Sequence, residues 1–151
     1  IAAELGTMKV SDEIDALEVM SIDPVDYLVL PRVIALAVMC PTLTVLSNLI
    51  GIYGGSVIAE QNLGVSPDLY WVGAVESLTS SGSVLPKEVF VGLLKSLIFG
   101  IAIAIVSCSA GLKARGGALG VGLAVQTAVR NSVLLIIVLG FVITWFFYFL
   151  T

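Results

Sequence analysis

Long runs of apolar residues, separated by short polar segments, dominate this chain. Residues 33–59 contain no charged side chain, and a helix of about 26 residues reaches about 39 Å. The hydrocarbon core of a bilayer is about 30 Å thick, so this run is long enough to cross a membrane with some tilt. The pattern predicts a first transmembrane helix over residues 28–59.

Two further apolar runs are long enough to span a membrane. Residues 89–112 contain one charged side chain, and a tight turn over residues 113–117 leads into a third run over residues 118–151, which also contains one. The third run ends with aromatic side chains of the kind found at membrane–water interfaces, Trp145 and Tyr148. The pattern therefore predicts an all-α polytopic membrane protein with three transmembrane helices in this chain.

Residues 1–27 form a polar arm before the first apolar run. Ser11 is suited to cap a helix N-terminus, acidic residues follow it, and Pro24 would end that helix. At about 100° per residue, apolar side chains recur on one face and acids on the opposite face: Val10, Ile14, Leu17 and Met20 against Asp12, Asp15 and Glu18. We expect a short amphipathic helix at the membrane surface.

Residues 60–88 form a polar connection between the first two apolar runs. The Ser-Pro-Asp sequence at residues 66–68 supplies a helix cap, a proline for the first helical position and an acid for the first turn. A short helix is therefore predicted through about Leu78. Residues 79–83 are typical of a loop, and Pro86 would begin the next helix.

The basic residues predict the orientation of the three spans. Four of them belong to the side that carries the arm and the turn at residues 113–117, whereas two belong to the other side: Lys9, Arg32, Lys113 and Arg115 against Lys87 and Lys95. Cytoplasmic loops of membrane proteins carry an excess of lysine and arginine. We therefore expect the arm to be cytoplasmic and residues 60–88 to be extracytoplasmic.

The composition is typical of a membrane protein, and it argues against a nucleic-acid partner and against histidine-dependent chemistry. The chain is 58% hydrophobic and 12% charged, with a mean hydropathy of +1.10, whereas soluble domains are about 45–50% apolar and about 25% charged. The net charge of −4 argues against a nucleic-acid partner. The chain has no histidine, the commonest general base and metal ligand, and its two cysteines, Cys40 and Cys108, are expected to be buried thiols.

The motifs predict no catalytic, metal or cofactor site. There is no phosphate-binding P-loop sequence, and without histidine there is no serine–histidine triad. The acids of the arm match no calcium loop and are more typical of a solvated helix face. Glycine pairs four residues apart are better explained by close helix packing than by phosphate binding: Gly51 with Gly55, and Gly116 with Gly120.

Three features leave alternatives open. A cation inside a membrane span is a candidate functional residue, so Arg130 and Lys95 are candidates for contact with lipid headgroups. Arg130 could equally reach headgroups or water with a structural role only, and Lys95 is close enough to the end of its span to extend to the interface. The apolar face of the arm could dock into a soluble partner, or it could rest on lipid or on the protein's own loops.

Several motifs of this chain, spread nearly from end to end, match one family. The chain resembles the MlaE-type permeases of ABC transporters that work with MCE-domain lipid-binding proteins. The resemblance rests on IAAELGTMKV at residues 1–10, EIDALEVM at 13–20, Asp23-Pro24, Leu30-Pro31-Arg32, GIYGG at 51–55, GLLKS at 92–96, Phe99-Gly100, GGA at 116–118, GVG at 120–122 and AVRNS at 128–132.

The resemblance implies a homodimeric permease bound to two ABC ATPase subunits and to an MCE protein. It would move phospholipid or a similar apolar lipid between the inner membrane and the outer envelope, in a bacterium or an organelle of bacterial origin. Permeases of this family carry two further spans at the N-terminus. Because the chain begins at Ile1 rather than methionine, we expect upstream sequence here too.

The resemblance also implies roles for particular residues. The arm would be the coupling helix that receives the motion of the ATPase, through Glu4, Met8, Glu13, Ile14, Leu17, Glu18, Met20 and Asp23. Two positions depart from the family pattern: Gln126 replaces a usual threonine, and Gly140 replaces a common aspartate.

Two rival hypotheses are a passive channel, favoured only by polar residues in the first span, and a structural membrane scaffold. Neither rival would have an ATPase partner.

Overall fold

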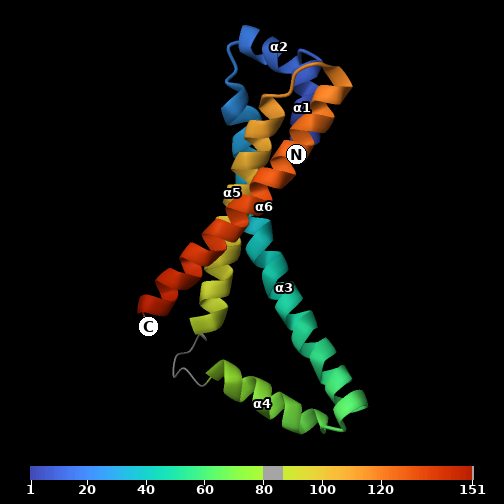
Figure 1. Ribbon diagram of the computed structural model, residues 1–151, viewed down its shortest axis with the longest axis vertical. Coiled ribbons are helices and arrows are strands. Elements are labelled where there is room, and N and C mark those ends of the chain that lie inside the picture. Colours follow the sequence, from blue (N-terminus) through green and yellow to red (C-terminus); the bar gives the residue numbers. More distant parts are fainter. Residues whose placement is uncertain (80–86, 151) are drawn as a thin grey trace. The chain divides into compact units, whose positions relative to one another are not determined.

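The structure is a computed structural model that describes residues 1–79 and 87–150. All of its regular elements in these ranges are helices, which confirms the predicted all-α class (Figure 1). In chain order they are α1 (Ala2–Val10), α2 (Glu13–Val19), the π-helix η1 (Val25–Val29), α3 (Leu30–Leu63), α4 (Pro67–Thr79), α5 (Lys87–Leu112) and α6 (Gly117–Leu150).

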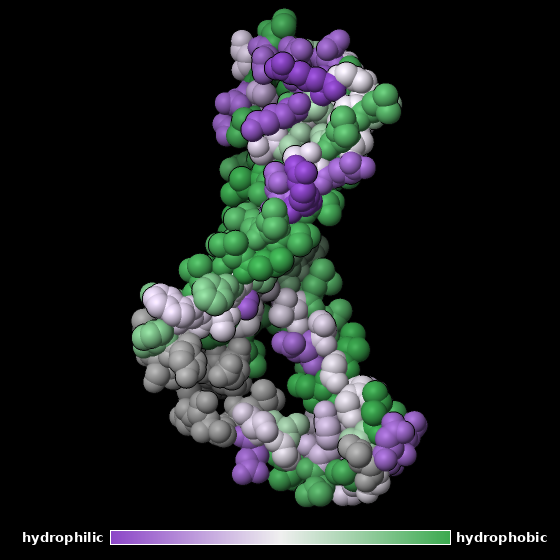
Figure 2. All heavy atoms as spheres, in the orientation of Figure 1, coloured by the Kyte–Doolittle hydropathy of each residue, from purple (hydrophilic) through white to green (hydrophobic). Residues whose placement is uncertain are grey.

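Three stretches of helix are long and apolar enough to cross a membrane: Val25–Asn62, Val89–Leu112 and Gly117–Phe147. This result confirms the prediction of three spans. Their most apolar windows are only 0%, 11% and 6% buried by the rest of the chain, so most of their side chains need lipid or another protein segment around them. Hydrophilic residues gather over the arm, whereas hydrophobic residues cover much of the spans (Figure 2).

The arm differs from the predicted single helix. It contains two helices, because Asp12 adopts a left-handed backbone (φ 59°) between α1 and α2. Ser11 is not the helix N-cap that the sequence predicted. It ends α1, where its hydroxyl donates a hydrogen bond to the Thr7 carbonyl at 2.9 Å. This back-bonding to the preceding turn is an alternative to N-capping that serine also offers.

Pro24 begins a helix and does not end one, which corrects a second prediction. Helix α2 already ends at Val19, and a left-handed residue, Ser21 (φ 60°), follows it. The Val25 amide donates a hydrogen bond to Asp23 Oδ1 at 2.9 Å, and Pro24 has the helical φ of −64°. Because proline is pre-set for the start of a helix, η1 and α3 continue from it without a break.

The described chain divides into two compact units, of which the first comprises residues 1–39 and 97–150. Its core brings together side chains from four elements, and it consists of Leu5, Ile14, Leu28 and Cys108. Helix α1 lies along the start of α6, where a Cβ atom on Gly6 would be 3.4 Å from Val121 Cγ1. A Cβ on Gly111 would be 2.8 Å from the Leu5 Cβ, so both glycines permit close helix contact.

The second unit comprises Cys40–Ser96, with the later part of α3, helix α4 and the start of α5. Pro41 lies inside α3 and removes one backbone donor from the helix. The Thr44 hydroxyl donates to the Cys40 carbonyl at 2.9 Å in the same turn. The chain turns from α3 into α4 at Gly64, whose positive φ of 64° suits glycine.

Candidate functional site

The side of α2 that the sequence offered for docking is turned inward. Ile14 is 2% exposed within the core of the first unit, and Leu17 is partly buried against that core. Met8 of α1 packs against the same core. Ile14 and Leu17 of the predicted face therefore contact the chain's own helices, whereas Met20 of that face is exposed. The side chains of Ile14, Leu17 and Met8 pack the arm against the core of the first unit.

A different surface of α2 faces outward. Val19 is 86% exposed and Met20 is 63% exposed at the end of the helix. The carboxylates of Glu13, Asp15 and Glu18 are also exposed on this helix. We call Glu13, Glu18, Val19 and Met20 the outer face of α2. Exposed apolar side chains such as Met20 are enriched at protein contact surfaces.

One ion pair joins the two helices of the arm, and a second joins the arm to α3. Lys9 of α1 pairs with Asp15 of α2, and both side chains are partly exposed. Its hydrogen bond to Asp15 raises the pKa of Lys9 above the ordinary value of 10.5, and the charges of Asp15 and Glu18 add to this effect. Glu4 of α1 pairs with Arg32 of α3 at 2.9 Å between Oε1 and Nη2. Glu4 is thus engaged within the chain, whereas Asp23 is exposed and its Oδ1 accepts a hydrogen bond from the Val25 amide.

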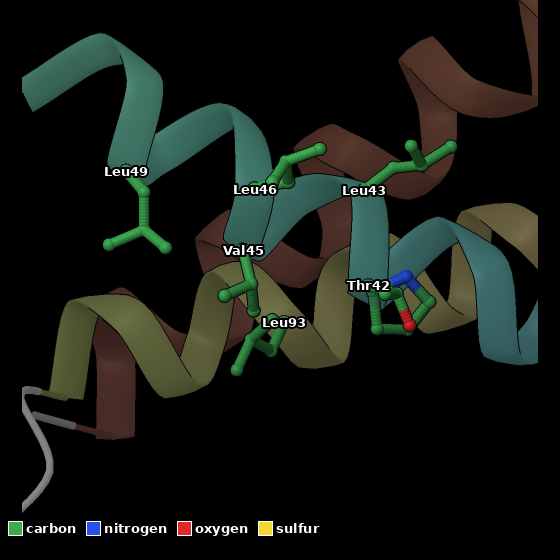
Figure 3. A pocket seen from close by; sticks show the side chains of 7 residues that line it. Thr42, Leu43, Val45, Leu46, Leu49 and Leu93 are labelled. Atoms are coloured by element: carbon green, nitrogen blue, oxygen red, sulfur yellow. The ribbon is translucent and has the colours of Figure 1, made fainter.

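An open apolar groove of about 490 Å³ lies within the second unit. Val45 and Leu93 point toward each other across it, and Leu46 and Leu49 line its length (Figure 3). Thr42 contributes the only polar side chain of its lining. A second groove of about 330 Å³ in the first unit is lined by apolar side chains alone, from Ile98, Ile101, Ala102, Ile105, Val106 and Leu135. Such surfaces suit hydrocarbon and offer little to a polar solute.

A comparison with known families decides what kind of membrane protein carries these features. The sequence model of the family described as "Permease MlaE" matches residues 1–146, from the arm to the last turns of α6. The chain belongs to the MlaE permease family. It is thus an integral inner-membrane protein of the transporter-permease class, as its resemblance implied.

Relatives of this MlaE-family chain occur in bacteria and in a plant. It is 44% identical over 144 residues to a "Probable ABC transporter permease protein" of Synechocystis, covering 95% of this chain and 52% of the relative. A protein of the same description from Rickettsia prowazekii is 40% identical over 149 residues, with 98% and 55% covered. "Protein TRIGALACTOSYLDIACYLGLYCEROL 1, chloroplastic" of Arabidopsis thaliana is 37% identical over 147 residues, with 97% and 40% covered.

The chain thus spans about half the length of the bacterial relatives it matches. The match includes the arm, both grooves and the two candidate membrane cations.

The two candidate cations of this MlaE permease lie in different helices. Arg130 is exposed on α6. Gly6 of α1 contacts Val121 of α6, and Arg130 lies nine residues later, about 14 Å further along the helix axis. Lys95 is partly buried in α5.

The glycines predicted for helix packing serve different purposes. A Cβ on Gly55 would overlap the Tyr70 hydroxyl of α4, and a Cβ on Gly120 would overlap the Arg115 carbonyl. Gly116 has a φ of 89° and shapes the turn before α6. Apart from the local backbone and chain neighbours, no described atom lies within 4 Å of a Cβ built on Gly51 or Gly116.

Sequence reasoning missed the contacts that join the arm to the spans. Gly6 and Gly111 permit close approach, and Arg32 pairs with Glu4, yet the partners are distant in sequence. Two sequence features gave indirect signals of these contacts. Gly111 interrupts an apolar helix, and Arg32 directly precedes a long uncharged run. Such signals mark a position as constrained but do not identify its partner.

Proposed function

We propose that this chain is part of the permease of an ABC transporter that moves phospholipid or a similar apolar lipid between an inner membrane and the outer envelope. The observation that carries the proposal is the groove of about 490 Å³ with a single polar side chain, in a chain of the MlaE family. The Arabidopsis relative supports a lipid cargo, since its name contains that of a glycolipid. Hydrocarbon chains match this lining better than a polar solute would.

A separate ATPase would supply the energy. The chain contains no P-loop sequence, and its bacterial relatives are named as ABC transporter permeases. In this proposal the ATPase docks on the outer face of α2, where Val19 and Met20 enter an apolar pocket and Glu13 and Glu18 meet basic residues. Ile14, Leu17 and Met8 then keep α2 fixed to the other helices, so that a push on the arm displaces the spans.

Further partners complete the proposed transporter. A second copy of the permease and an MCE-domain protein would enclose the lipid path, because the spans leave large apolar side chains exposed, including Leu46, Ile137 and Phe141. Arg130 and Lys95 would contact the phosphate of a lipid headgroup from within the spans. Neither contact requires a cofactor or a metal.

The docking step is tested in the complete complex by a double substitution, Val19→Asp with Met20→Asp. The added charges should prevent burial of both side chains and abolish copurification of the ATPase. Val72→Asp is the matched control, because Val72 is 63% exposed on α4 and lies outside the proposed interface. Full retention of the ATPase by the double variant would disprove docking at this face.

The cargo is tested by extracting lipid from the purified complex and identifying it by mass spectrometry. Leu46→Trp should fill the groove and reduce the bound lipid, whereas Ile50→Trp, one turn later on α3 and outside the groove, should not. If the wild-type complex carries no lipid, or if both variants carry the wild-type amount, the groove is not the lipid site.

A further inference from the structure

The Glu4–Arg32 ion pair joins the arm to the first membrane span. Its two side chains differ sharply in environment: that of Arg32 is 20% exposed, and that of Glu4 is 65% exposed. The Nη1 atom of Arg32 is buried and has no hydrogen-bond partner among the described residues. The guanidinium therefore depends on Glu4 for charge compensation.

The pair lies at the edge of the core of the first unit. Glu4 directly precedes Leu5, which is fully buried, and Arg32 lies one helical turn after Leu28. Residues at this spacing share one face of a helix. The pair thus closes over the place where α1 meets the start of the first span.

The location of Arg32 at the start of the first span should strengthen its attraction to Glu4. Arg32 is the last charged residue before the uncharged run over residues 33–59, so it lies where the chain enters hydrocarbon. Attraction between charges increases as the local dielectric constant falls. An apolar contact between α1 and α3 could slide, whereas a guanidinium–carboxylate pair fixes the register of the two helices.

We propose that Glu4 and Arg32 are positioning residues that transmit displacement of the arm to α3 during transport. The proposal rests on the proposed function, in which a partner ATPase pushes on α2. Movement passes from α2 to α1 through their shared apolar core, and from α1 to α3 through Glu4 and Arg32. Without the pair, the arm moves and α3 does not follow.

The test measures lipid transported per ATP hydrolysed by the complete complex in liposomes. Arg32→Gln should leave ATPase copurification and basal hydrolysis intact but reduce this ratio about tenfold, as expected when a typical coupling between two sites is lost. Exchange of the charges, Glu4→Arg with Arg32→Glu, should restore most of the ratio. Lys9→Gln is the matched control, since it removes an ion pair within the arm and should leave the ratio near wild type.

Two outcomes would overturn the proposal. One is an unchanged ratio in Arg32→Gln, and the other is a charge exchange that remains as impaired as the single variant while its melting temperature equals that of the wild type. If Arg32→Gln does not fold, Arg32→Lys replaces it; this variant keeps the charge and should retain most of the ratio, and a tenfold loss would contradict the proposal. Failure of the wild-type chain to bind any ATPase would instead refute the proposed function itself.

Discussion

The arm and the membrane spans of this chain bury apolar side chains in different ways. The arm supplies Leu5 and Ile14 to a core in which both are almost completely buried. The spans leave residues such as Leu134 and Ile137 more than half exposed, although they are more apolar than the arm. The first region satisfies its apolar residues within the chain, and the second needs lipid or further protein around it.

This difference predicts which substitutions should change the stability of the chain when no other subunit is bound. In the arm, the partners of each buried residue are present, so a change in packing should change the stability of the fold. In the spans, an exposed leucine exchanges one hydrocarbon environment for another on folding, because lipid tails are as apolar as leucine. Loss of such a side chain should cost little unless another subunit covers it.

The largest expected effect is at the centre of the arm core. Leu5→Ala should lower the free energy of unfolding by about 2–5 kcal/mol, because it leaves a cavity among packed helices. Leu134→Ala should change it by less than about 0.5 kcal/mol, as expected for an exposed position. Reversible unfolding in mixed detergent micelles measures both. Equal losses would mean that the two regions are stabilised alike.

Two glycines of helix α5 give the next largest contrast. A Cβ on Gly111 would lie 2.9 Å from the Ala2 carbonyl oxygen, so Gly111→Ala should destabilise the arm by about 1–3 kcal/mol. Gly92→Ala, in the same helix with open space around the new Cβ, should stabilise it by up to about 1 kcal/mol. The same unfolding measurement applies. Stabilisation by Gly111→Ala would show that α1 does not pack there.

A pair of substitutions tests the packing of α3 against α4 in the second unit. Gly55→Ala should force the Tyr70 ring aside and cost about 1–2 kcal/mol, because the Tyr70 hydroxyl occupies the space of the new methyl group. Adding Tyr70→Phe removes that hydroxyl and should recover most of the loss. A double-mutant cycle of unfolding free energies measures the recovery. Strictly additive losses would contradict the contact between α3 and α4.

The smallest effect concerns the exposed Lys9–Asp15 pair. The pKa of Lys9 should lie above 10.5, and Asp15→Asn should lower it toward that value, as followed by NMR titration of labelled lysine. Because the folded-state pKa is raised, the stabilising contribution is present below pH 10.5 and is lost as the pH rises through the folded-state pKa. No change in the Lys9 titration in the Asp15→Asn variant would show that the pair does not form in solution.

Much of the fold could be predicted from the sequence, because long uncharged runs report the solvent around a helix directly. The periodicity of Ile14, Leu17 and Met20 predicted one apolar face, but it could not identify what covers that face. In the structure Ile14 and Leu17 face the chain's own core, whereas Met20 faces outward. Left-handed residues at Asp12 and Ser21 divide the arm, and no local pattern predicted them because neither residue is glycine.

The candidate site could be predicted only in part, because the sequence pattern does not identify which segments pack against each other. The sequence could single out the arm as the element proposed to meet a partner, but which of its side chains are exposed depends on contacts between residues far apart in sequence. The Glu4–Arg32 pair joins residues in separate helices, and hydrophobic periodicity carries no information on such pairs.

The central claim is that Ile14 holds α2 to the chain while Met20 meets the ATPase. The most direct measurement is photo-crosslinking in the complete complex, from a thiol-reactive crosslinker attached to Met20→Cys or to Ile14→Cys in a Cys40→Ser background. Met20→Cys should crosslink to the ATPase subunit, whereas Ile14→Cys should crosslink only within the permease or resist labelling. Crosslinking of the ATPase from position 14 and not from position 20 would contradict the account.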